Sequence, residues 1–101
     1  MHPPVPARFV REMGCTVEEL CTWIPGATRY APIEWSRPEG EAAVRLPEGT
    51  VQIRWTPLPP RRIALVVLPR LQVSFDFGDM GQETRSRFMR HFDLYTQRGG
   101  G

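Results

Sequence analysis

The chain contains no lysine: all thirteen basic residues among its 101 residues are arginine. Chemistry that needs a lysine amine, such as Schiff-base formation, is therefore excluded. Arginine presents a planar fork of donors that suits carboxylates and phosphates, so one interpretation is anion or nucleic-acid recognition. The other is a genome rich in G and C, whose codons favour arginine, alanine, proline and glycine, and this interpretation predicts a bacterial source. The net charge of +2 is too small to indicate a polyanionic partner by itself.

Histidine and cysteine are scarce, with two residues of each. A catalytic triad needs a base, and the candidates are His2, in a proline-rich start, and His91, which lies among arginines. Cys15 and Cys21 fit neither a Cys-x-x-Cys motif nor a common zinc pattern, so we expect no metal site. We also expect no cofactor, because the glycine-rich and lysine-containing nucleotide motifs are missing.

Long hydrophobic runs are missing too. The longest, Ile63–Leu68, is far shorter than the roughly 20 residues that cross a bilayer. Residues 1–6 lack the basic and apolar regions of a secretory signal. We therefore expect no membrane association and a cytoplasmic location.

What is present predicts one small folded domain. The hydrophobic fraction of 41% and the charged fraction of 24% are typical of globular proteins. We expect a mostly flexible, proline-rich segment over residues 1–15, with a short helical turn over Ala7–Met13. A single domain follows over residues 16–97, and a flexible glycine-rich tail over residues 98–101.

Two segments have helical patterns. Thr16-Val17-Glu18-Glu19 matches a capping box, and the helix that it starts should end at Pro25-Gly26. A longer helix is predicted over residues 82–97. Its apolar face, which should cover a sheet, carries Phe88, Met89, Phe92 and Tyr95.

Alternating apolar residues predict strands in three places. Residues 42–46 and 51–55 form two such patterns separated by a short turn, which indicates a hairpin. Residues 71–77 have the clearest two-residue period in the chain. The mixed segment from Ala27 to Pro38 predicts an irregular edge strand.

Between these patterns lie a proline cluster and the apolar run. Pro57-Leu58-Pro59-Pro60 has few backbone donors, so we expect a stiff connector outside the sheet. Ile63–Leu68 predicts a central core strand covered on both faces, or a strand with an exposed face that a partner covers. Leu68-Pro69-Arg70 should form a tight turn, or a bulge that bends one long strand.

The element order predicts an α+β fold. We expect a small antiparallel sheet of about four to five strands, with a short N-terminal helix and a longer C-terminal helix packed on one face.

Three features suggest function. A ligand or partner surface is predicted at Tyr30, Trp35 and Arg37, because amphipathic rings are enriched at binding patches. A basic face on the last helix, continued by the tail, could hold phosphates, and it comprises Arg87, Arg90, His91 and Arg98. Cys15 precedes a helix, where amide dipoles can stabilise a thiolate nucleophile.

These features give three hypotheses. The leading one is a non-enzymatic bacterial domain that binds a protein or small ligand, with a protein partner or a homo-oligomer formed through the sheet. The second is nucleic-acid or phosphate binding through the last helix. The third is an enzyme with a dispersed site that uses Cys15.

Overall fold

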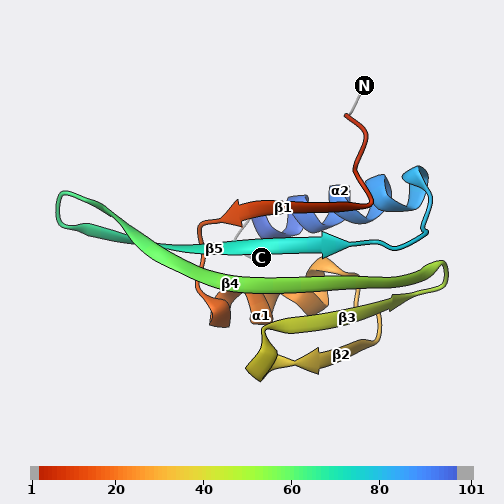
Figure 1. Ribbon diagram of the computed structural model, residues 1–101, viewed down its shortest axis with the longest axis horizontal. Coiled ribbons are helices and arrows are strands. Elements are labelled where there is room, and N and C mark those ends of the chain that lie inside the picture. Colours follow the sequence, from red (N-terminus) through yellow and green to blue (C-terminus); the bar gives the residue numbers. More distant parts are fainter. Residues whose placement is uncertain (1–2, 98–101) are drawn as a thin grey trace.

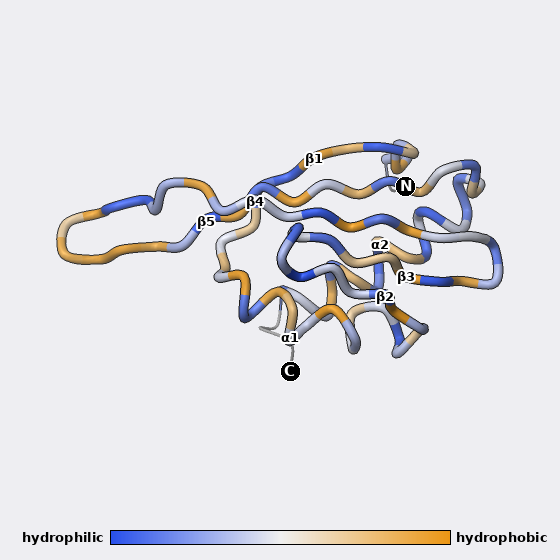
Figure 2. The backbone as a smooth tube through the Cα atoms, turned by 60° about the horizontal axis from the view of Figure 1, so that its bottom comes forward, coloured by the Kyte–Doolittle hydropathy of each residue, from blue (hydrophilic) through white to orange (hydrophobic). Residues whose placement is uncertain are grey.

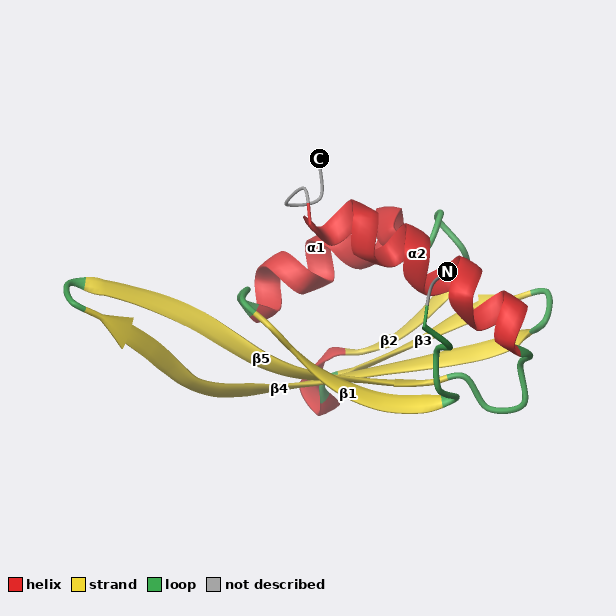
Figure 3. Ribbon diagram, turned by 90° about the horizontal axis from the view of Figure 1, so that it is seen from above, coloured by secondary structure: helices red, strands yellow, loops and turns green. Residues whose placement is uncertain are grey.

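The computed structural model describes residues 3–97 and contains one five-stranded antiparallel sheet with two helices. The strand order is β1-β5-β4-β3-β2. Both helices lie on the same face of the sheet (Figure 1, Figure 3). The predicted α+β fold is therefore confirmed. In chain order the elements are β1 (Arg8–Met13), α1 (Val17–Ala27), β2 (Ile33–Ser36), the 3-10 turn η1 (Arg37–Glu39), β3 (Glu41–Leu46), β4 (Gly49–Ile63), β5 (Val66–Asp76) and α2 (Gln82–Gln97).

The core lies between the sheet and the helices. The predicted alternation is confirmed, because every second residue is buried under the helices over residues 42–44 of β3, 51–55 of β4 and 71–75 of β5. Aromatic side chains join the layers: the rings of Phe75 and Phe92 meet edge to face at 5.1 Å, and those of Phe77 and Phe88 at 5.4 Å. The predicted apolar face of α2 thus packs on the sheet, with Phe88, Met89 and Phe92 buried.

The opposite face of the sheet is polar. Pairs of arginine and carboxylate side chains run across it from strand to strand, which leaves this face in water rather than against a second layer. The pairs are Arg8 with Asp76, Arg54 with Glu41, Arg45 with Glu34 and Arg70 with Glu12.

Helix α1 begins as predicted. The Glu19 amide donates to the Thr16 hydroxyl at 3.1 Å, and the Thr16 amide donates to the Glu19 carboxylate at 2.9 Å, which completes the capping box. The predicted end at Pro25-Gly26 is wrong, because the helix continues to Ala27. The Thr28 hydroxyl donates to the carbonyl of Ile24 at 2.8 Å and so caps this last turn.

The N-terminal prediction is also wrong over Ala7–Met13. Arg8–Met13 forms edge strand β1, which pairs with β5 from Arg8 opposite Asp76 to Met13 opposite Leu71. The strand was missed because exposed Val10 interrupts the two-residue pattern that a half-buried strand normally shows. The sheet therefore starts inside the segment that was expected to be flexible. The predicted tail, residues 98–101, lies outside the described residues.

The other large correction concerns β4 and β5. Ile63–Leu68 is not a core strand: its turn residues are Ala64 and Leu65, and most of its large side chains are exposed. Pro57–Pro60 is part of β4 rather than a connector outside the sheet. Of the two alternatives at Leu68–Arg70, the turn is wrong and the long strand is confirmed, because these residues continue β5 and the register shift lies opposite them, between Leu58 and Arg61 of β4. The predicted hairpin of β3 and β4 and the predicted edge strand, β2, are confirmed. None of the helices within residues 3–97 is long and apolar enough to cross a membrane.

Candidate functional site

Strands β4 and β5 continue well beyond the rest of the sheet. Strand β3 pairs with β4 over residues 49–54, and β1 pairs with β5 over residues 71–76. Residues 56–70 therefore form an extension whose outer edges carry no further strand, which we call the projecting arm. Figures 1 and 3 show it extending away from both helices, and the molecule measures 45 × 35 × 24 Å.

Prolines shape both edges of the projecting arm. The Trp55 amide donates to the Gly40 carbonyl at 2.9 Å, so it points away from β5. Amide directions alternate along a strand, so Pro57 and Pro59 face the same free edge, where no N–H is needed. The register shifts between Leu58 and Arg61, so that Pro59 and Pro60 lie opposite a single residue, Pro69. This is the geometry of a β-bulge, and it explains how a proline cluster fits within paired strands.

The tip of the projecting arm is apolar. Leu65 is 100% exposed, and four other aliphatic side chains are between 42% and 54% exposed: Ile63, Val66, Val67 and Leu68. Figure 2 shows this end of the tube as hydrophobic. Five of the eight large hydrophobic side chains that are exposed in the described chain lie within these few residues. A cluster of this kind marks an interaction site, because exposed apolar residues are normally scattered.

The tip is apolar on both faces of the hairpin. Residues 66 and 68 alternate with residue 67 along β5, so Val66 and Leu68 lie on one face and Val67 on the other. Ile63 is opposite Val66 and shares its face. A partner pocket that surrounds the tip would therefore cover more of these side chains than a flat partner surface would.

Arginines surround the base of this tip. Arg61 and Arg62 are exposed, and neither forms an ion pair with a carboxylate within residues 3–97. Arg70 connects the arm to the sheet: its Nη2 donates to Glu12 at 2.8 Å and its Nη1 donates to the Pro59 carbonyl at 3.1 Å. The hydrogen bond from Arg70, with the nearby charge of Arg61, lowers the pKa of Glu12.

Of the three residues of the predicted ligand or partner surface, Tyr30, Trp35 and Arg37, the structure brings two into contact. The Arg37 guanidinium lies over the Trp35 ring at 4.5 Å from its centroid, and Trp35 is half-buried. Tyr30 lies in the loop after α1 and is 77% exposed. No ring contact joins Tyr30 to Trp35 in the described part of the chain. The geometry thus places Trp35 and Arg37 together as a cation–π pair at the β2 edge.

The side chains of the predicted basic face of α2 also turn to different partners. Arg87 pairs with Glu48 at 2.8 Å, and not with Glu83 as the helical spacing suggests. His91 turns toward α1, where its Nε2 lies 3.0 Å from the Gly26 carbonyl. Arg90 is exposed, and Arg98 lies outside the described residues. The structure therefore shows no continuous row of unpaired cations along the described part of this helix.

A small cavity lies beside Arg87 and His91. It has a volume of about 330 Å³ and lies between the end of α1, the turn from β3 to β4, and α2. Arg29, which has a φ of 56°, also lines it. The volume and the mixed lining are typical of small-ligand pockets, which the sequence hypothesis also included.

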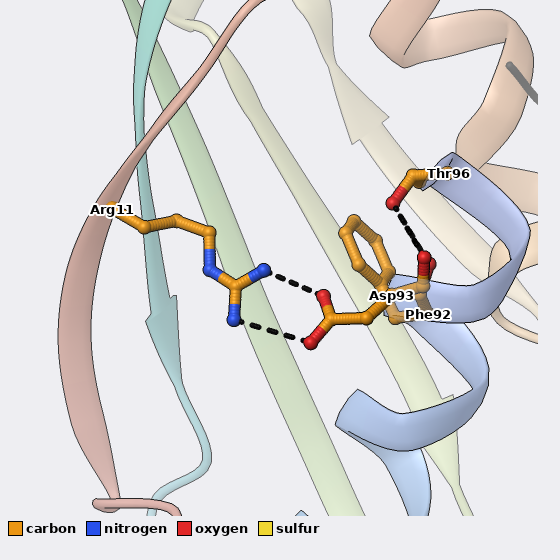
Figure 4. Close-up of polar contacts among 4 residues, drawn as sticks. All are labelled: Arg11, Phe92, Asp93 and Thr96. Carbon is orange, nitrogen blue, oxygen red and sulfur yellow. Dashed lines mark hydrogen bonds and ion pairs between the residues drawn. The ribbon is translucent and has the colours of Figure 1, made fainter. Parts of the chain in front are cut away.

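A larger groove lies at the β1 edge of the sheet. It has a volume of about 540 Å³ and is bounded by residues 3–6, β1 and α2. Arg11 crosses it to Asp93, with the nitrogen and oxygen atoms 2.5 Å and 3.4 Å apart (Figure 4). The apolar walls are provided by Val5, Pro6, Phe9, Met89 and Leu94.

Cys15 does not have the surroundings of a reactive thiol. It is 2% exposed, and burial, followed by the nearby Glu19 charge, raises its pKa to about 11. Cys15 lies in the bend between β1 and α1, as a loop thiol, and both it and Cys21 are buried. The expected helix dipole effect is outweighed by desolvation.

Within residues 3–97, no three His, Cys, Asp or Glu side chains come close enough to hold a metal ion together. Comparisons with protein-family models, curated proteins and solved structures found no match to this chain.

Sequence reasoning missed the projecting arm. The signal that was available is symmetry: the apolar run is flanked by Arg61-Arg62 and a proline cluster on one side, and by Pro69-Arg70 on the other. Prolines at matching distances from an apolar turn are expected for a free-standing hairpin, because proline is confined to edges and bulges.

Proposed function

We propose that this chain is a non-enzymatic protein-binding domain that acts through the projecting arm. The observation that carries the proposal is the cluster of exposed aliphatic side chains at the tip. Burying a fully exposed Val, Leu or Ile side chain contributes about 1.5–3 kcal/mol. Leu65 is fully exposed and the other four are about half exposed, so the five side chains together offer roughly 4.5–9 kcal/mol before the costs of association. This gain is comparable with the cost of association, about 4–15 kcal/mol, so a partner must enclose the whole tip to bind it.

The prolines support a particular mode of binding. A partner strand added to a sheet edge needs a row of free backbone donors. Pro57, Pro59 and Pro69 lack these donors along the arm, and edge prolines protect a strand against such pairing. The proposed contact is therefore made by side chains of the tip, inserted into an apolar pocket of the partner.

The free face of the sheet is polar, which favours the arm over the sheet as the binding site. Its arginines and carboxylates are paired with one another across neighbouring strands. A partner on this face would desolvate these ion pairs, which costs more than desolvating an apolar tip. We also propose a bacterial source, because all basic residues are arginine, and a cytoplasmic location, because the sequence has no apolar run longer than Ile63–Leu68.

Nucleic-acid or phosphate binding through α2 is a second proposal with less support, because Glu48 neutralises Arg87 and His91 faces α1. It is tested by titrating single-stranded RNA at low and physiological salt. Binding that weakens steeply with salt and is lost in Arg87→Glu and Arg90→Glu would favour it.

The main proposal is tested by photo-crosslinking. A photoreactive phenylalanine derivative replaces Leu65 in the cells that naturally produce the chain, and a matched control replaces Gln72, an exposed residue on the polar face of β5. We expect discrete protein adducts from position 65 and none of the same mass from position 72. Equal adduct patterns from both positions, or none from either, would contradict the proposal.

A further inference from the structure

We propose that the small cavity beside Arg29 and His91 is a second binding site, and that its ligand is a small monocarboxylate with an apolar body. The cavity lies between the end of α1, the turn from β3 to β4, and α2. No residue of the projecting arm lines it, so this site is independent of the proposed protein contact.

The apolar part of the wall provides room for the body of the ligand. The apolar lining residues are Ala27, Ala31, Leu46, Pro47 and Phe88. The Phe88 ring is held in place by Phe77, which it meets edge to face at 5.4 Å. A volume of about 330 Å³ lies at the small end of the range of ligand pockets, which fits one ring or a short branched chain.

The charged part of the wall favours an anion. The charged lining residues are Arg29, Glu48 and Arg87. Glu48 and Arg87 pair with each other at 2.8 Å, and Arg29 forms no ion pair among the described residues. Two arginines and one glutamate give one net positive charge when histidine is counted as neutral, so one carboxylate balances the wall. An arginine fork can bind that carboxylate through two parallel hydrogen bonds.

The end of α1 adds little attraction for a cation, because its carbonyls already accept hydrogen bonds. The Gly26 carbonyl accepts from the Arg29 amide at 3.1 Å and lies 3.0 Å from His91 Nε2. The Pro25 carbonyl accepts from the Tyr30 amide at 2.8 Å. Donors of the protein therefore cover the negative end of this helix dipole, which favours an anionic ligand over a cationic one.

The backbone holds Arg29 beside the cavity in a strained conformation. Arg29 and Tyr30 have φ angles of 56° and 60°, in the left-handed region that residues other than glycine rarely adopt. Strained backbone of this kind is concentrated at ligand-binding sites. The Arg29 side chain is exposed, so its guanidinium is accessible to a ligand.

Titrations of the full chain, followed by amide NMR shifts, test the site. The probe is benzoate, which has one carboxylate on a flat apolar ring, and benzamide is a neutral control of the same shape. Each is added to about 20 mM at constant ionic strength, because so small a ligand is expected to bind only in the millimolar range. We expect benzoate to shift amides within residues 27–31, 46–48 and 84–91. Benzamide should bind about tenfold more weakly, because it lacks the charge.

Two variants should change the affinity in opposite directions, which a general loss of structure would not do. Arg29→Gln should weaken benzoate binding by about tenfold or more, because a charge-assisted hydrogen bond is lost. Glu48→Gln removes the negative charge of the wall and frees Arg87, so it should strengthen binding by about two- to fivefold. Arg90→Gln, at an exposed arginine of α2 that does not line the cavity, is the matched control and should leave the affinity unchanged.

Thermal melting verifies the fold of each variant, and E48Q with the benzamide control decides the question if R29Q melts at a lower temperature. The inference is overturned by shifts that are not confined to the cavity, by equal binding of benzamide, or by an unchanged affinity in both R29Q and E48Q. Inorganic phosphate that shifts the same amides as strongly as benzoate would also overturn it, and would support phosphate binding at α2 instead. None of these results would affect the proposed function of the projecting arm, which lies outside this cavity.

Discussion

Arg70 and Glu12 join the projecting arm to the edge of the sheet through a hydrogen bond of 2.8 Å between Nη2 and the carboxylate. Arg70 belongs to β5, where the arm begins, and Glu12 belongs to β1. The same guanidinium also holds the Pro59 carbonyl beside the bulge. One side chain thus connects three strands at the base of the arm.

The Glu12–Arg70 pair should make stability depend on pH. The pKa of Glu12 is lowered in the folded state, so its contribution is present at neutral pH and is lost as pH falls through the ordinary glutamate pKa of about 4.3 and below. We expect Glu12→Gln to melt at a slightly lower temperature than the wild type at pH 7, and at the same temperature near the acid end of the titration. Thermal melts across this range measure the difference. Glu39→Gln, at an exposed carboxylate in η1, is the control, and an equal effect in both variants would refute a specific role for the pair.

Truncation should cost much stability at Leu71 and almost none at Leu65, although both belong to the β4–β5 hairpin. Leu71 is 2% exposed, and Leu71→Ala should lower the free energy of unfolding by about 2–5 kcal/mol. Leu65→Ala removes no buried contact and should change it by less than about 0.5 kcal/mol. Urea denaturation of the monomer at low concentration compares the two. A large loss in L65A would mean that the tip packs within its own chain.

The Arg11–Asp93 pair should contribute measurably to stability, because it holds α2 against β1 beside the Phe75 ring. Both side chains are about one-third exposed, so solvent screens part of the attraction. We expect Asp93→Asn to lower the free energy of unfolding by about 1 kcal/mol. Urea denaturation measures it, with Glu83→Gln in the first turn of α2 as the control. A loss in E83Q as large as in D93N would argue against the pair.

Cys15 should react slowly while the chain is folded. With a pKa raised to about 11, roughly one molecule in ten thousand carries the thiolate at pH 7, and burial further limits access. We expect slow alkylation by iodoacetamide in the native state, with rapid reaction of both cysteines in denaturant. Mass spectrometry follows the modification. Rapid labelling of native Cys15 would revive the hypothesis of a catalytic thiol.

Much of the fold could be predicted from local patterns. Alternating residues such as Val51, Ile53 and Trp55 determine strands because one face of each strand is buried, and the Thr16–Glu19 capping box determines where α1 begins. Strand β1 escaped this reasoning, because an exposed Val10 removes the alternation.

The candidate site was harder to predict for a physical reason. An apolar run such as Ile63–Leu68 has the same sequence whether it is buried or extends into solvent, and exposure depends on which strands lie beside it. The order β1-β5-β4-β3-β2 leaves residues 56–70 without outer neighbours, and no local pattern specifies that order. Likewise, the pairing of Arg87 with Glu48 joins residues far apart in the chain.

The most direct test of the projecting arm is cysteine labelling. The native Cys15 and Cys21 are buried, so they should add little to the labelling signal. Leu65→Cys and, as a control, Gln72→Cys are labelled with a maleimide in a gentle native lysate and again after purification to dilute monomer. We predict that position 65 is protected in the lysate and reactive in the monomer, whereas position 72 reacts equally in both. Equal labelling of position 65 in both samples would show that nothing covers the tip and would contradict the account.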